Sequence, residues 1–140
     1  MKVVKCKKVL NKGVRDNTLD TLVRQYIRLI SDGYCRRCKQ RVGVEYIEAA
    51  HMYKRRKKTV RWDLRNVYPL CIDNPNTGRK GCHSIVDNDE IELVNFMYDV
   101  MSKEEIKELQ RIATMTLKDY PIDREKIKED LKQKIKGLEK

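Results

Sequence analysis

Four of the five cysteines in this 140-residue chain are spaced as the ligands of one metal ion would be. Cys35 and Cys38 form a C-x2-C pair, so that a single turn can aim two thiolates at one ion, and Cys71 and Cys82 offer a second pair. Zinc bound by four thiolates at about 2.3 Å is the natural occupant of such a set. The second pair is more widely spaced than usual, so the segment between its members must loop out and return. The sequence therefore predicts a structural Zn²⁺ site.

Other interpretations of these cysteines stay open at this point. They could be buried free thiols, a redox C-x-x-C pair, or a zinc site in which His83 replaces Cys82. A redox role needs a thioredoxin-like βαβ setting, which this sequence lacks. We favour Cys82 over His83 as the fourth ligand, and we expect Cys6, isolated in a basic segment, to be an ordinary thiol.

The two histidines of the chain stand at positions suited to a second kind of chemistry. His51 ends an apolar stretch directly before a basic run, and an imidazole can accept a proton from water at neutral pH. His83 directly follows Cys82. If these two residues open a helix, their side chains diverge by about 100°. One of them can then face the zinc while the other faces a substrate.

Together these residues resemble the zinc-containing HNH nucleases of the ββα-metal class. The shared pattern is C-x2-C, a histidine ending a short strand, an asparagine before the third cysteine, and a last cysteine followed at once by histidine. The stretches EAAHM and LRNVYPLC are also similar to NinG-type phage recombination proteins. The matching residues are Cys35, Cys38, His51, Asn66, Cys71, Cys82 and His83.

The resemblance implies metal-dependent hydrolysis of DNA phosphodiester bonds, which could serve phage recombination or DNA processing. It makes His51 the general base, Asn66 the amide that ties the loop holding this base, and His83 a ligand of a catalytic Mg²⁺ or Mn²⁺ ion. Such hydrolysis needs an activated water and a cation that stabilises charge on the phosphate and the leaving oxygen. The implied partner is DNA, with no small-molecule substrate.

One position departs from the family. Many members have an aspartate or histidine metal ligand immediately before the general base, where this chain has Ala50. We expect Asp87 to substitute, because it lies four residues after His83 and would share its helix face. Glu48 is the poorer candidate, since strand alternation points it to the opposite face from His51.

A basic run lies between the two motif residues His51 and Asn66. Residues 53–65 carry seven cations against the single acid Asp63, and cations beside a scissile phosphate add affinity without reading sequence. A solvated loop is the alternative. Trp62, the only tryptophan, is expected in the core. The predicted DNA-contacting residues are Lys54, Arg55, Arg56, Lys57, Lys58, Arg61 and Arg65.

Composition supports a polyanionic partner. The formal net charge is +11, from 32 Lys and Arg against 21 Asp and Glu. No run approaches the roughly 18 apolar residues of a membrane span, and lysines interrupt the apolar residues of MKVVKCKKVL too often for a secretory signal. We expect a cytoplasmic protein with no membrane partner, and the resemblance to phage recombination proteins implies that it is phage-encoded.

The elements that must position these residues follow from periodicity. A helix is expected from a cap at Asp16, Asn17 or Thr18 to a stop at Gly33. Short strands are expected near 42–51 and 66–71, a turn-rich loop at 72–81, and one or two helical pieces over 82–100. A capping box is expected at Ser102 and Glu105. The last helix bears a narrow apolar stripe that suits its own domain better than a partner chain, formed by Ile127, Leu131, Ile135 and Leu138.

The predicted fold class is α+β, a small zinc-stapled ββα-metal (HNH) module flanked by N- and C-terminal helices. Residues 1–17 form a basic arm, 18–100 the nuclease domain with its core motif at 35–90, and 101–140 a helical extension. The chief alternative is a non-catalytic zinc-finger DNA-binding protein, which explains Ala50 directly. A protein-interaction adaptor built on the C-terminal helices is a third class. The oligomeric state is left open.

Overall fold

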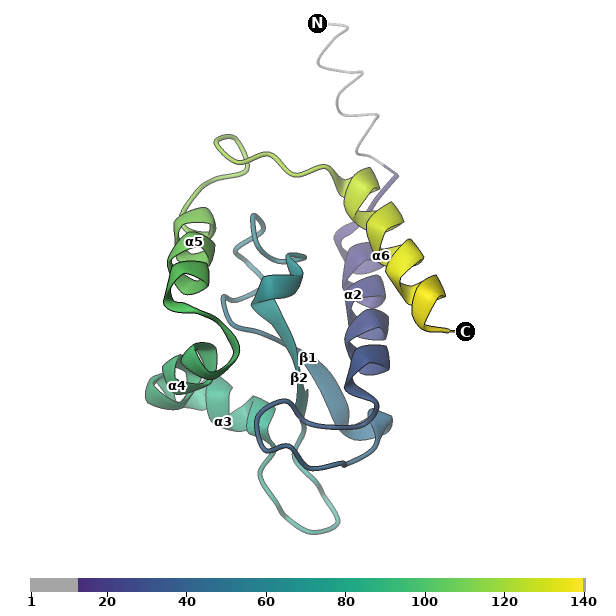
Figure 1. The fold of residues 1–140 in the computed structure, drawn as a ribbon, viewed down its shortest axis with the longest axis vertical. Coiled ribbons are helices and arrows are strands. Elements are labelled where there is room, and N and C mark those ends of the chain that lie inside the picture. Colours follow the sequence, from purple (N-terminus) through teal and green to yellow (C-terminus); the bar gives the residue numbers. More distant parts are fainter. Residues whose placement is uncertain (1–12, 140) are drawn as a thin grey trace, which may run out of the picture.

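The computed structural model describes residues 13–139, in which five helices surround a two-stranded antiparallel sheet (Figure 1). The predicted α+β class is confirmed. Residues 1–12 of the predicted basic arm, Cys6 included, lie outside the described residues. The elements are α2 (Asp16–Ser31), β1 (Ile47–His51), β2 (Val67–Cys71), α3 (Cys82–Asn88), α4 (Glu90–Val100), α5 (Lys103–Ala113) and α6 (Arg124–Leu138), with short 3-10 turns η1 (Val44–Tyr46) and η2 (Leu64–Asn66).

The leading helix forms where the apolar period predicted it, but the cap prediction was wrong. The N-cap of α2 is Arg15, and no side chain caps this end. Asp16 accepts instead from the Arg124 guanidinium, so its carboxylate is committed to α6 rather than to its own backbone. At the other end Asp32 and Gly33 take left-handed conformations, with φ of 48° and 82°, which end the helix and turn the chain toward Cys35.

The register of the sheet separates the two predicted sites. Ile47 is opposite Cys71 at one end of the β1–β2 pair, and His51 is opposite Val67 at the other end. The backbone N–H of Arg36 donates to the carbonyl of Pro69 over 2.9 Å, so the C-x2-C turn is attached to β2. The thiols therefore gather at the Cys71 end, while His51 lies next to the η2 turn.

Two hydrophobic clusters flank the sheet. The larger one joins the sheet to α3, α4 and α5 and includes Leu70, Phe96 and Leu109. The smaller one joins it to α2 and α6 through Leu19 and Leu131. Figure 1 shows α2 and α6 side by side on one side of the sheet and α3 to α5 on the other.

The C-terminal part follows its sequence pattern closely. The predicted capping box is present, since Ser102 accepts from the Glu105 backbone and Glu105 accepts from the Ser102 backbone. On α6, Leu131 and Ile135 are buried while Leu138 is exposed, and the helix packs along α2 of the same chain. None of the helices within residues 13–139 combines the length and the apolar composition that a membrane span requires.

Candidate metal centre and histidine cleft

The four predicted zinc ligands come together. The sulfurs of Cys35, Cys38, Cys71 and Cys82 all lie within 4.8 Å of one another, and the Cys38 and Cys71 sulfurs are 4.0 Å apart. Four thiolates at zinc bond length stand about 3.8 Å apart around a tetrahedral ion, so this cluster could hold a metal ion such as zinc. None of the four forms a disulfide, and three of them are buried.

The wide spacing between Cys71 and Cys82 is accommodated as a closed loop. Residues 72–81 leave the end of β2 and return to the start of α3, with Asn74 and Arg79 joined by a backbone hydrogen bond of 2.9 Å. The Gly81 N–H donates to the Asp73 carboxylate over 2.8 Å. A Cβ at Gly81 would overlap the backbone of Cys71 and Ile72. Glycine is therefore required where the loop brings Cys82 back to Cys71.

The protons on these thiols respond to burial and to one another. Burial raises the pKa of Cys71 to about 12 and also raises the pKa of Cys82. Burial acts in the same direction on Cys38, but hydrogen bonds from the Gln40 backbone and the neighbouring thiols outweigh it and lower this pKa to about 7. Arg37 donates to the Cys82 sulfur over 3.4 Å. A divalent cation at the centre would supply the positive charge that lets all four thiols ionise.

Both histidines line one cleft of about 510 Å³ on the β1 side of α2, which we call the histidine cleft. His51 reaches it from the end of β1, and His83 reaches it from the first turn of α3. The Cys82 side chain lies in the sulfur cluster and the His83 side chain lines this cleft. Adjacent residues of one helix therefore belong to two different sites. Charged side chains also line the cleft, among them Arg24, Arg28, Glu48, Lys54 and Asp87.

His51 is held in one tautomer. Its Nε2 lies 2.9 Å from the carbonyl oxygen of Arg61, and a carbonyl only accepts, so Nε2 carries the proton. The neutral ring then keeps the lone pair on Nδ1. Burial lowers the pKa of His51 below its ordinary value, and the nearby Arg55 charge adds to this. A neutral imidazole with a free lone pair is the form that accepts a proton from water.

Asn66 ties the loop that follows His51. This side chain is fully buried, and its Oδ1 accepts from the Tyr53 N–H over 2.7 Å. Its Nδ2 donates to the carbonyls of Tyr53 and Val60 over 3.0 and 3.1 Å. Three backbone groups on the segment after β1 are thereby fixed by one amide. Met52 is attached to the same place, because its N–H donates to the Asn66 carbonyl over 2.8 Å.

His83 lies between two carboxylates. Its Nδ1 is 2.7 Å from Glu48 and its Nε2 is 3.3 Å from Asp87. Lys54 also approaches Asp87, at 3.0 Å. Among residues 13–139, the cysteines alone form a cluster whose ligand atoms converge as tightly as a metal requires. Glu48, His83 and Asp87 are neighbours, and a shared ion would need their side chains to turn toward one point.

Glu48 and His51 meet at one cleft. Strand alternation points their Cβ atoms to opposite faces of β1, and both side chains nevertheless line this cleft. The Glu48 carboxylate lies 2.7 Å from Nδ1 of His83 on α3, so the end of this long side chain reaches the cleft that His51 enters from the end of β1. Alternation predicts the direction of Cβ, not where a flexible carboxylate ends.

The basic run is largely neutralised by acids of the same chain. Lys54, Arg55, Lys58, Arg61 and Arg65 each form an ion pair. Arg56 and Lys57 are exposed and form no ion pair within the described part of the chain. They are therefore the members of the run most open to a phosphate.

Arg61 and Trp62 are structural. The Arg61 side chain is only 12% exposed and binds Asp20 at 2.6 Å, and the Trp62 indole N–H donates to the same carboxylate over 2.8 Å. Burial opposes ionisation of Asp20, but these hydrogen bonds outweigh it and lower its pKa. The predicted core position of Trp62 is confirmed.

Sequence reasoning missed the cations that α2 contributes. Arg24 and Arg28 line the histidine cleft one turn apart, and the Arg28 Nε donates to the Ile47 carbonyl over 3.1 Å. Their i, i+4 spacing on the face beside the apolar stripe was the available signal. It could not be used without knowing that α2 lies across β1.

Comparisons with models of protein families, with curated proteins and with solved structures found no match for this chain.

Proposed function

We propose that this protein is a metal-dependent endonuclease that hydrolyses DNA phosphodiester bonds at an HNH-like ββα-metal site formed by β1, β2 and α3. The observation that carries the proposal is the shared cleft: His51 and His83 line it, while Asn66 fixes the loop behind His51. These are the three positions that the resemblance assigns to base, metal ligand and loop-tying amide.

In this proposal His51 accepts a proton from the attacking water at Nδ1. The Arg61 carbonyl holds the ring in position from the Nε2 side, and the low pKa that burial gives the imidazole keeps it neutral at physiological pH. Asn66 keeps the loop that follows His51 in place and touches no substrate. Arg24 and Arg28 would contact phosphates from the α2 side, and Arg56 and Lys57 from the loop.

The residues that would hold a catalytic Mg²⁺ or Mn²⁺ ion are His83, Asp87 and Glu48. An imidazole with two carboxylates is a donor set that suits these ions. When bound, the ion supplies positive charge beside the scissile phosphate and the leaving oxygen. Glu48 would provide the carboxylate that Ala50 cannot, although it stands two residues earlier in β1.

The zinc centre has a separate, structural role in the proposal. It joins the C-x2-C turn, the end of β2 and the start of α3, and so sets the position of His83. Four thiolate ligands leave no open coordination position for a substrate.

A non-catalytic DNA-binding protein is the second candidate, favoured by one observation. His83 and Asp87 already have partners in Glu48 and Lys54, and their ligand atoms do not converge. This candidate predicts salt-dependent DNA binding and no cleavage with any divalent ion.

Plasmid nicking separates the two. We expect the purified, zinc-loaded protein to nick supercoiled DNA with Mg²⁺ or Mn²⁺, and His51→Ala to abolish nicking while zinc content and DNA affinity stay near wild type. Gln133→Ala, on the exposed part of α6, is the control variant. Undiminished nicking by His51→Ala would remove the base from the proposal, and no nicking by wild type would favour the second candidate.

A further inference from the structure

A second cleft, of about 550 Å³, lies on the opposite side of α2 from the histidine cleft. We call it the tyrosine cleft. It is bounded by α2, by the C-x2-C turn and by β2. Its lining includes Tyr26, Ile30, Tyr34, Arg36, Lys39 and Tyr68.

The lining of the tyrosine cleft combines aromatic rings with positive charge. It contains three tyrosines and two cations, and neither an aspartate nor a glutamate. The histidine cleft differs, because three carboxylates line it. Arg41 adds a third cation nearby, with its guanidinium 6.0 Å from the centre of the Tyr34 ring. A polyanion with flat apolar groups matches this surface in both charge and shape.

Tyr34 presents its ring to solvent on a fixed backbone. The residue is 48% exposed, as is its neighbour Ile30 at 44%. Its N–H donates to the Ser31 carbonyl over 2.8 Å, and it forms a β-bridge with Arg41. Because the backbone is held on both sides, stacking on this ring costs little ordering of the chain.

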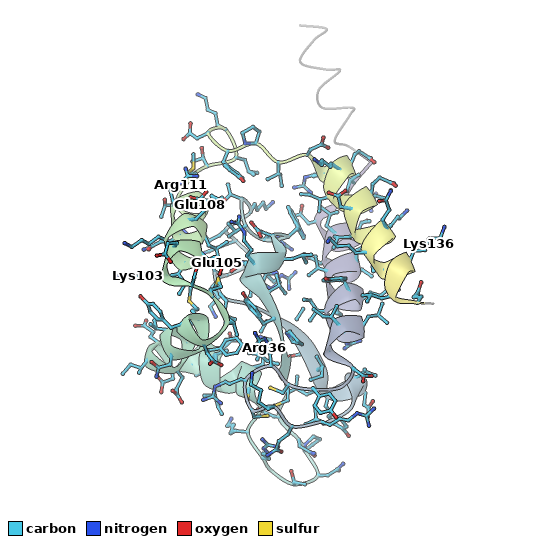
Figure 2. The ribbon with its side chains drawn as sticks, in the orientation of Figure 1. Arg36, Lys103, Glu105, Glu108, Arg111 and Lys136 are labelled. Carbon is cyan, nitrogen blue, oxygen red and sulfur yellow. The ribbon has the colours of Figure 1, made fainter. Side chains whose placement is uncertain are left out.

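Arg36 lies on the segment that leaves α2, near the lower end of the sheet in Figure 2. Its backbone is attached to Pro69, whereas its side chain is exposed and forms no ion pair among residues 13–139. Lys39 is likewise exposed in the same turn. These two cations stand at the mouth of an apolar cleft, where backbone phosphates would pass.

We propose that the tyrosine cleft binds an unpaired nucleotide of a DNA strand, with the base stacked on Tyr34 and flanking phosphates near Arg36 and Lys39. Base stacking on an exposed aromatic ring beside cations is the usual chemistry of single-strand binding. The proposal takes its partner class, DNA, from the proposed function, but it needs no hydrolysis. It would direct the protein to single-stranded or branched DNA rather than to uniform duplex.

The test is fluorescence anisotropy of a labelled oligothymidylate and of a duplex of equal length, with zinc-loaded protein and no added divalent ion. We expect Tyr34→Ala to weaken single-strand binding about tenfold, and duplex binding by less than about twofold. Tyr34→Phe keeps the ring and should bind as wild type, whereas Tyr34→Leu keeps apolar area without the ring and should not. Lys39→Gln should reduce the slope of log affinity against log salt concentration for the single strand by about one released counterion.

Tyr98→Ala is the matched control, because Tyr98 is an exposed tyrosine on α4, outside this cleft. Equal binding by the Tyr34→Ala and Tyr98→Ala variants, or full binding by Tyr34→Leu, overturns the proposal. So does wild-type protein that fails to bind the single strand. If the protein nicks DNA but its binding does not depend on the Tyr34 ring, the nuclease proposal stands and the tyrosine-cleft proposal fails. If binding depends on the ring but no nicking occurs, the tyrosine-cleft proposal stands and the nuclease proposal fails.

Discussion

The sulfur cluster and the histidine cleft are built in opposite ways, although one helix serves both. The cluster uses a single ligand type, is mostly buried, and its members face one point. The cleft mixes imidazoles, carboxylates and guanidinium groups around an open space, and its histidine and carboxylates contact one another instead of converging. A metal site that stabilises a fold can be closed, whereas a site that binds a substrate, as proposed for the cleft, must leave open space and unpaired charge.

The two regions are coupled through a single peptide bond. Cys82 belongs to the cluster and His83 to the cleft, so the position of one fixes the position of the other. At the far end of the sheet, His51 depends on Asn66 rather than on any cysteine. Damage to the cluster should therefore displace His83 and leave His51 in place, while damage around Asn66 should do the opposite.

Gly81→Ala is expected to have the largest effect, because the new Cβ would overlap the backbone of Cys71 and Ile72. The loop can then no longer return Cys82 to the cluster. We expect zinc affinity to fall by more than about tenfold and thermal stability to drop with it. Zinc content by mass spectrometry and melting by circular dichroism measure both.

Gly137→Ala is the matched control for this change. An added Cβ at Gly137 meets nothing within 4 Å, and the residue lies in α6. Alanine there should stabilise the helix by about 0.5–1 kcal/mol and leave zinc unaffected. Zinc bound as tightly by Gly81→Ala as by Gly137→Ala would show that the loop is not needed to close the cluster.

Asn66→Ala should have the next largest effect, and a different one. It leaves two carbonyls and one N–H of the Tyr53 and Val60 backbone without their buried partner. The expected cost is about 2–4 kcal/mol in the free energy of unfolding, by denaturant titration, with zinc retained. In the proposed nuclease the nicking rate should fall as well.

The contrast with His51→Ala sharpens this prediction. His51→Ala removes only one hydrogen bond to a carbonyl, so it should abolish nicking at a smaller cost in stability. If the two variants lost stability equally, Asn66 would not be the residue that holds the loop.

Sequence reasoning succeeded where the signal is local. The C-x2-C pair, the helix opening at Cys82, the strand ending at His51 and the capping box at Ser102 all depend on residues close together in the chain. Their spacing alone limits the geometry, because a turn or a helix converts sequence distance directly into spatial distance.

Sequence reasoning missed the ion pairs between distant elements, although it predicted the cluster that joins the two distant pairs of cysteines. The pairing of Asp20 with Arg61 spans 41 residues, and that of Glu48 with His83 spans 35. Periodicity predicts neither pair, because it does not show which acid lies next to which cation. The packing of α2 on β1 determines that. The basic run was for the same reason expected to be more open than it is.

The smallest expected effect is on the pH dependence of stability, which distinguishes the histidine cleft from the sulfur cluster. Burial lowers the folded-state pKa of His51, so the unfolded chain binds a proton there more readily than the folded one. The stability contributed by neutral His51 is complete above the unfolded pKa of about 6.5 and is lost as pH falls from there toward the folded value. His51→Gln can still donate to the Arg61 carbonyl but does not titrate, so it should flatten the dependence of the unfolding free energy on pH below about pH 6.5. Acid also protonates the thiolates and releases zinc, which likewise lowers the unfolding free energy as the pH falls. Zinc must therefore be quantified at each pH. If wild type and His51→Gln lose stability in parallel while zinc is released, the pH dependence belongs to the sulfur cluster and not to the histidine cleft.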